Sequence, residues 1–162
     1  MATNISLNQF APNTPIAGLY VYMANLPQLH NVIVSSSVTA ETPLAPGAVL
    51  TLDSTATNLH APVAKQAAVN DNIFGVLVYN PIVNRFVAGD RIAVARDNDV
   101  IWMPAEAAIT EGAELYFTAD NTVTATATAG NSILGKALTP ATAKGDFVQV
   151  ELRFRTTQAA GG

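Results

Sequence analysis

The sequence predicts an all-β protein, a compact barrel or sandwich built from two related β units and preceded by an extended N-terminal arm. Three observations favour this fold: apolar and polar residues alternate in short runs, Asp, Asn and Gly turns separate these runs, and part of the sequence is repeated. We expect an arm with the first strands over residues 1–40, a duplicated β domain over 41–156, and a flexible tail over 157–162.

The arm is defined by its lack of charge, because no charged side chain occurs in Met1–Ala40. Its longest apolar stretch, Ala17–Met23, is too short to span a bilayer, and no basic region of a signal peptide precedes it. Disordered tails are usually charged, so an uncharged apolar arm is better suited to lie against another protein. The expected partner-binding residues are Phe10, Pro12, Pro15, Ile16, Leu19, Tyr20 and Tyr22.

Short apolar runs predict the next strands in order. They lie at Leu19–Ala24, Asn31–Val38, Val49–Leu52 and Phe74–Tyr79. Helical composition is confined to Ala105–Ala108 and to parts of Pro62–Val69, and the second of these stretches is equally compatible with a strand.

Two further strand pairs are each separated by an Asp and Asn turn, since these residues tolerate the left-handed backbone of a tight hairpin. The expected hairpins are Arg91–Arg96 with Asp99–Trp102 around Asp97-Asn98, and Leu115–Thr118 with Thr122–Thr126 around Asp120-Asn121. The only tryptophan, Trp102, is expected in the core or in a subunit contact.

The clearest strand is Phe147–Arg155, which alternates with period two. One face carries Val148, Val150, Leu152 and Phe154. The other face carries Gln149, Glu151, Arg153 and Arg155, and we interpret it as solvated.

The internal repeat relates residues 44–96 to residues 109–155. LAPGAVLTL around Gly47 matches ITEGAELYF around Gly112, and Ile73-Phe74-Gly75 matches Ile133-Leu134-Gly135. The pairs Gly89-Asp90 and Gly145-Asp146 also recur. We interpret these pairs as folding signals, in which Gly permits the turn and Asp accepts a backbone hydrogen bond.

Composition excludes several classes of partner. Charged residues make up 12% of the 162-residue chain, against about 25% in ordinary soluble domains, while the hydrophobic share is 49%. The low charge indicates that Thr, Asn, Ser and Gln hydrate the surface, that other subunits cover part of it, or, as we favour, both together. A net charge of −4 gives no general attraction to nucleic acid, and the lack of cysteine rules out disulfides and thiolate metal sites.

Motifs of catalysis and of metal or cofactor binding are missing from the sequence, so we expect no enzyme, no cofactor and no metal. Asp53-Ser54 near His60 could be part of a hydrolytic triad, but Asp and Ser at a strand end are common turn residues. Asp97-Asn98-Asp99 resembles the start of a calcium loop, but Ala108 stands where a bidentate Glu belongs, so a turn explains it better.

The order of the glycine-punctuated segments resembles the capsid decoration, or cement, proteins of tailed bacteriophages. The resemblance is carried by Pro46–Leu50, Ile73–Val76, Ala88–Val94 and the shorter second cycle, and it covers Thr42–Arg155. It implies a structural protein made in the host cytoplasm and added to the outside of an icosahedral head. There it would bridge neighbouring major capsid subunits, commonly as a homotrimer and in some cases as a dimer.

Two alternatives stay open on the sequence. One is a virion binding module, such as a head-fibre base, a tail component or a glycan-binding adhesin, which copy number per particle would separate from a cement. The other is an enzyme, which would need His30 or His60 beside a carboxylate in a cleft.

Overall fold

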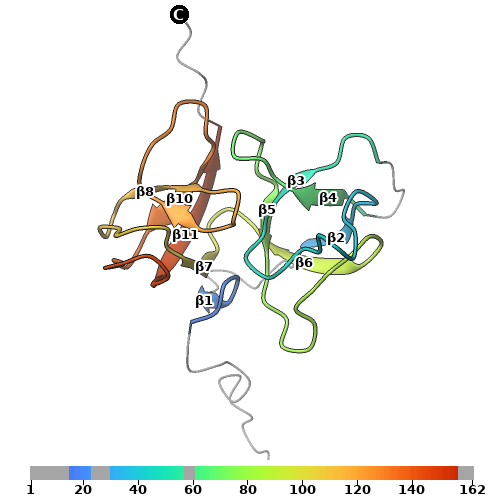
Figure 1. Cartoon of the computed structure of the whole chain (residues 1–162), viewed down its shortest axis with the longest axis horizontal. Helices are drawn as coiled ribbons and strands as arrows, with labels where there is room; N and C mark the ends of the chain where they lie inside the picture. The colour runs from blue at the N-terminus through green and yellow to red at the C-terminus, as the bar shows by residue number, and fades with distance from the viewer. Residues whose placement is uncertain (1–14, 23–29, 57–60, 157–162) are drawn as a thin grey trace, which may run out of the picture.

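A computed structural model describes residues 15–22, 30–56 and 61–156, which form two β lobes side by side (Figure 1). All regular structure in the described residues is β, as predicted. The strands are β1 Tyr20–Tyr22, β2 His30–Val34, β3 Val49–Leu52, β4 Val63–Gln66, β5 Gly75–Leu77, β6 Arg91–Ala95, β7 Val100–Pro104, β8 Glu114–Phe117, β9 Val123–Thr124, β10 Ile133–Ala137 and β11 Phe147–Arg155.

The first lobe is a closed barrel in the order β2-β4-β3-β5-β6. Its strands pair antiparallel except for β2 and β4, which run parallel and close the barrel. Small branched side chains suit the narrow interior of a five-stranded barrel. The interior cluster includes Val32, Val34, Leu50, Leu77 and Val94, all at most 1% exposed.

The second lobe is a six-stranded sheet in the order β1-β7-β11-β10-β8-β9. It almost closes as well, because Ala105 and Val123 form a parallel bridge between the end of β7 and β9. The amide of Glu106 donates to the Val123 carbonyl at 2.8 Å. In the barrel, the amide of Ser35 donates to Ala64 at 2.8 Å in the corresponding place.

Each lobe also contains backbone hydrogen bonds at positions that correspond to those of the other lobe. The amide of Gly47 donates to Leu77 at 2.8 Å, and the amide of Gly112 donates to Ala137 at the same distance. An antiparallel bridge joins Leu44 to Phe86 in one lobe and Ile109 to Ala141 in the other. The two repeat segments, residues 44–96 and 109–155, therefore connect their strands in the same order. Their origin by duplication and the domain boundaries stay predictions.

One core joins the lobes, because β3, β5 and β6 each bury residues both in the barrel interior and against the sheet. Successive residues of a strand point to opposite sides, so Leu50 faces the barrel interior while Val49 packs against the sheet. The shared cluster combines Val49, Val76 and Ala95 of the barrel with Ile101, Met103, Leu115, Phe117, Val148 and Val150 of the sheet.

Polar bonds also link the two lobes. Asn121, in the β8–β9 turn, accepts a hydrogen bond from the Val49 amide at 3.0 Å, and Ser132 Oγ donates to the Asp71 carbonyl at 2.7 Å. The lobes are thus positioned by packing and by directional bonds together.

The expected last strand is confirmed, with β11 spanning Phe147–Arg155. Val148, Val150 and Leu152 are fully buried on one face, whereas Arg153 and Arg155 are exposed on the other. The β8–β9 hairpin is also confirmed, with Asn121 left-handed at φ 58°.

The expected hairpin around Asp97-Asn98 is wrong. The turn exists, with Asn98 at φ 73°, but β6 belongs to the barrel and β7 to the sheet. The Asp120-Asn121 turn has the same pattern, with positive φ at its asparagine alone, and it still joins a hairpin, so the turn does not decide the outcome. Tertiary pairing does, because β6 pairs with β2 and β5, whereas β7 pairs with β1 and β11.

The two stretches of helical composition form no helix. Val63–Gln66 is strand β4, as the alternative interpretation allowed, and residues 105–108 form a bridge and a bend. Pairing with β2 and β3 fixes β4, so tertiary context overrides the helix propensity of this stretch. Strand β10 was not predicted, because Gly135 interrupts its alternation.

Candidate functional site

The structure places part of the expected binding arm. Phe10 and Pro12 lie outside the described residues. Pro15 is exposed, Ile16 and Leu19 are half-buried, and Tyr20 and Tyr22 belong to β1, which pairs with β7. Whether these residues contact a partner stays a prediction.

Gly18 anchors the arm to both lobes. Its amide donates to Trp102 of β7 at 2.8 Å, and its carbonyl accepts from Tyr79 of the barrel at 2.9 Å. At φ 75° it is left-handed, and a Cβ would lie 2.5 Å from the Leu77 carbonyl oxygen. Half-buried Trp102 donates its own amide to Leu19 at 2.9 Å, so it contacts the arm of its own chain.

Tyr20 also has an intramolecular role. Its ring packs against the shared core, and its hydroxyl donates to Asp99 Oδ2 at 3.3 Å. Burial raises the pKa of Tyr20, and the neighbouring Asp99 carboxylate raises it further. The arm is therefore fixed over Gly18–Tyr20 by these contacts and over β1 by pairing with β7.

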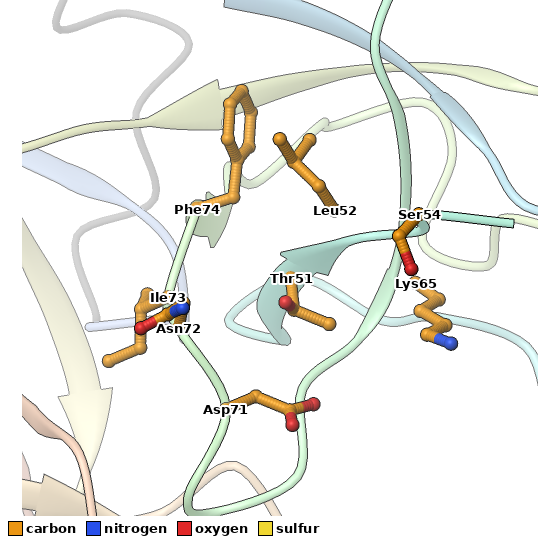
Figure 2. A pocket seen from close by; sticks show the side chains of 8 residues that line it. All are labelled: Thr51, Leu52, Ser54, Lys65, Asp71, Asn72, Ile73 and Phe74. Atoms are coloured by element: carbon orange, nitrogen blue, oxygen red, sulfur yellow. The ribbon is translucent and has the colours of Figure 1, made fainter. Parts of the chain in front are cut away.

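A cleft of about 480 Å³ opens beside the barrel (Figure 2). It is lined by Thr51, Leu52, Ser54, Lys65, Asp71, Asn72, Ile73 and Phe74. In Figure 2 the side chains of Thr51 and Asp71 face the same space, while Phe74 lies beside Leu52. Asp71 Oδ2 already accepts a hydrogen bond from the Ala68 amide at 2.9 Å, so this carboxylate holds a turn.

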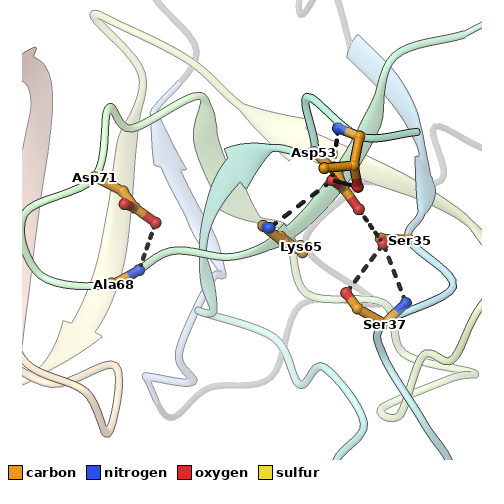
Figure 3. Close-up of polar contacts among 7 residues, drawn as sticks. Ser35, Ser37, Asp53, Lys65, Ala68 and Asp71 are labelled. Atoms are coloured by element: carbon orange, nitrogen blue, oxygen red, sulfur yellow. Dashed lines mark hydrogen bonds and ion pairs between the residues drawn. The ribbon is translucent and has the colours of Figure 1, made fainter. Parts of the chain in front are cut away.

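Next to this cleft, Asp53 is the centre of a polar cluster (Figure 3). Ser35 Oγ donates to Asp53 Oδ2 at 2.5 Å, and Thr55 donates to Oδ1 from its hydroxyl at 2.7 Å and its amide at 3.1 Å. Lys65 Nζ lies 3.8 Å from Oδ1. The Ser35 bond, then those from Thr55, lower the pKa of Asp53 to about 2.

The cluster does not assemble the imagined triad from described residues. Asp53 bonds Ser35 and Thr55, whereas Ser54 is exposed and lines the cleft. His60 lies outside the described residues, and His30 is exposed at the start of β2. The Asp53 carboxylate links the end of β3 to the chain after β2, which is a structural task.

The Gly-Asp pairs act as predicted. Gly89 and Gly145 are left-handed at φ 86° and 90°. Asp90 Oδ2 accepts from the Val87 amide at 2.8 Å, and Asp146 Oδ2 accepts from Ala143 at 3.0 Å and from Thr142. Bonds from Thr142 and then Ala143 lower the pKa of Asp146.

The carboxylates of Asp97-Asn98-Asp99, the run that resembles the start of a calcium loop, also accept backbone hydrogen bonds. Asp99 Oδ2 accepts from the Arg96 amide at 2.8 Å, and Asp97 Oδ1 accepts from the Phe154 amide at 2.7 Å. Over residues 15–22, 30–56 and 61–156, no group of three or more His, Cys, Asp or Glu side chains could hold a metal ion. The same ranges contain no helix long and apolar enough to cross a membrane.

The basic side chains at the end of β11 face solvent with acidic neighbours. Arg153 lies 2.9 Å from Glu151, and Arg155 lies 3.5 Å from Glu114. Exposed pairs of this kind contribute little to stability. They agree with the predicted solvated face.

The structure contains an apolar surface that the sequence did not predict. It lies beside Tyr20 and includes Ile82, whose side chain is 90% exposed. The run Asn80-Pro81 signals a turn, but its exposure depends on the tertiary fold.

Comparison with known proteins gives one family and one fold. A family model described as phage cement protein matches residues 30–152. A search of curated proteins finds no match. Among solved structures, the head fiber gp8.5 N base in bacteriophage phi29 is similar at 16% identity and a TM-score of 0.52, covering 79% of this chain and 95% of that chain. At this identity the likeness concerns the fold.

Proposed function

The chain belongs to the phage cement protein family, and on that premise we propose that it binds the outer surface of an icosahedral phage head and stabilises contacts between major capsid subunits. The family match over residues 30–152 carries the proposal, because it includes the whole barrel and most of the sheet. The protein would reside in the virion, on the capsid, after synthesis in the host cytoplasm.

The physical basis of such a function is binding alone. A cement acts through buried area repeated over many equivalent sites, which gives avidity without a reactive group. A molecule whose two lobes share one core suits this task, since a rigid protein loses little conformational entropy when it binds.

We assign the first contact with the major capsid protein to the N-terminal arm. The segment before Gly18 is uncharged and includes Phe10, Pro12, Pro15 and Ile16. Leu19, Tyr20 and Tyr22 follow in the anchored part, so they would position the arm as well as border the contact. Extended segments of this kind bind by adding backbone and apolar side-chain contacts to a partner.

The proposal also includes self-association as a homotrimer, with a dimer as the alternative. The low charge of the chain supports it, because exposed apolar surface is covered when subunits associate.

The experiment is reconstitution on expanded heads that lack the protein. Added protein should bind in many copies, in proportion to the shell subunits, and should raise the temperature at which the heads release DNA. Heads that bind no protein, or that bind it without gaining stability, would contradict the proposal.

A second candidate is the base of a head fibre. The fold shared with the phi29 head fiber base favours it, since the likeness covers 95% of that chain. The protein content of the particle separates the two functions, because a fibre base would be accompanied by a distal fibre protein, whereas a cement acts without one.

A further inference from the structure

The loop between β5 and β6 exposes apolar side chains to an unusual degree. Residues 81–85 are all exposed, and Ile82 and Val83 are 90% and 40% exposed. A single exposed apolar residue is ordinary on a protein surface. This loop differs because it is ordered and because it borders an apolar groove.

Backbone and polar side-chain hydrogen bonds fix the loop, and the apolar side chain of Ile82 takes no part in them. Asn80 Oδ1 accepts from the amides of Ile82 at 2.9 Å and Val83 at 3.2 Å. Leu44 and Phe86 exchange two backbone bonds of 2.9 Å at the base of the loop, and the Arg85 guanidinium donates to the Ala40 carbonyl at 3.2 Å. A preordered loop loses little entropy on binding.

The groove beside the loop has a volume of about 320 Å³. Its lining contains no charged side chain and consists of Tyr20, Val78, Tyr79, Asn80, Pro81, Ile82, Phe86 and Ala93. Tyr20 belongs to β1, so the groove is continuous with the anchored end of the arm. Figure 1 shows the β5–β6 loop projecting from the barrel on the side where β1 lies.

We infer that the loop tip, residues 81–84, and this groove form a second contact with the head shell. Ile82 inserts into an uncharged apolar depression of the shell protein, while the groove receives an apolar side chain from it. The inference rests on the proposed function for the identity of the partner. The groove shares Tyr20 with β1, the anchored end of the arm that we assign to the shell, and this continuity favours the shell as the occupant.

The test compares full-length wild type with Ile82→Asp and with the matched control Leu52→Asp. Leu52 is also apolar and 47% exposed, but it lines the separate cleft that contains Lys65 and Asp71. Affinity for expanded heads lacking the protein is measured by co-sedimentation. Ile82→Asp should weaken binding about tenfold or more, as loss of a central apolar anchor does, and Leu52→Asp should leave it within about twofold.

Thermal unfolding and light scattering accompany the binding measurement, and all three proteins should unfold alike and have the same mass. Unchanged binding by Ile82→Asp, or equal weakening by both variants, would overturn the inference. A smaller mass for Ile82→Asp would overturn it in favour of a second copy as the occupant. Wild type that fails to bind heads would instead refute the proposed function, and with it the identity of this partner.

Discussion

At the scale of single residues, aspartates organise the turns of this molecule. Asp71, Asp90, Asp99 and Asp146 each accept a hydrogen bond from the amide three residues earlier. In each case the aspartate amide donates back to the carbonyl of that same residue, at 2.9 to 3.3 Å. The sequence predicted this role for Asp90 and Asp146 because glycine precedes both of them.

The Asp53 cluster could not be predicted in the same way. Its donor Ser35 is 18 positions away in the sequence, and only the closure of β2 against β4 brings the two side chains together. Turn residues predict hydrogen bonds only between neighbours in the sequence, whereas the hydrogen bond between Ser35 and Asp53 forms only when the barrel closes.

Replacing Ser35 with Ala should destabilise the protein by about 1–2 kcal/mol, because it removes a fully buried hydrogen bond to a carboxylate. Since the bond lowers the pKa of Asp53 to about 2, its stabilisation is present above the unfolded pKa of about 4 and is lost as pH falls through 2. Urea unfolding across this pH range measures the difference in free energy of unfolding between wild type and Ser35→Ala, and this difference should narrow toward low pH. A difference that does not change with pH would contradict this role of the bond.

At the scale of elements, the alternation of apolar and polar residues alone predicted strand β11, because one of its faces is buried and the other faces solvent. Alternation did not predict the pairing of β3, β5 and β6, because each of them buries residues both in the barrel interior and against the sheet. Their apolar runs indicated strands but not which neighbour each strand would choose. The wrong hairpin at Asp97-Asn98 has the same cause, since pairing partners are set by tertiary contacts.

The close approach of β10 to β11 makes a specific prediction at Gly135. A Cβ there would lie 2.1 Å from the Glu151 carbonyl oxygen, so Gly135→Ala should destabilise the protein by about 3 kcal/mol. Gly89→Ala is the matched control, because its Cβ meets nothing within 4 Å and only the left-handed backbone opposes it, at about 1–2 kcal/mol. Thermal unfolding that ranks Gly89→Ala as the more damaging change would contradict this account.

At the scale of the whole molecule, the sequence predicted an all-β fold of two related units and the family to which the chain belongs. It did not reveal that the barrel closes through a parallel pair or that the second unit forms a six-stranded sheet that includes β1. Both features depend on contacts between residues far apart in the chain, which short repeated motifs do not specify.

Self-association is the first prediction at this scale. Light scattering of the purified protein at micromolar concentration should give the mass of three chains, because association covers apolar surface that the low charge leaves poorly hydrated. A strict monomer would contradict the proposed trimer, and the mass of two chains would favour the dimer.

The arm supplies the second prediction. Deletion of Met1–Thr14 should keep β1, Gly18 and the Tyr20 contacts, so thermal unfolding should be unchanged, while attachment to expanded heads should weaken. A matched variant that keeps the length, Phe10→Asp, should weaken attachment in the same direction. Full attachment by both variants would remove the arm from the contact.

Cryo-electron microscopy of the particle tests whether this protein bridges neighbouring subunits of the head shell. We expect density for both β lobes on the outer surface, repeated over equivalent shell positions and touching neighbouring major capsid subunits, with the β1 side of the molecule toward the shell. Density confined to one site per particle, or no density on the head at all, would contradict it.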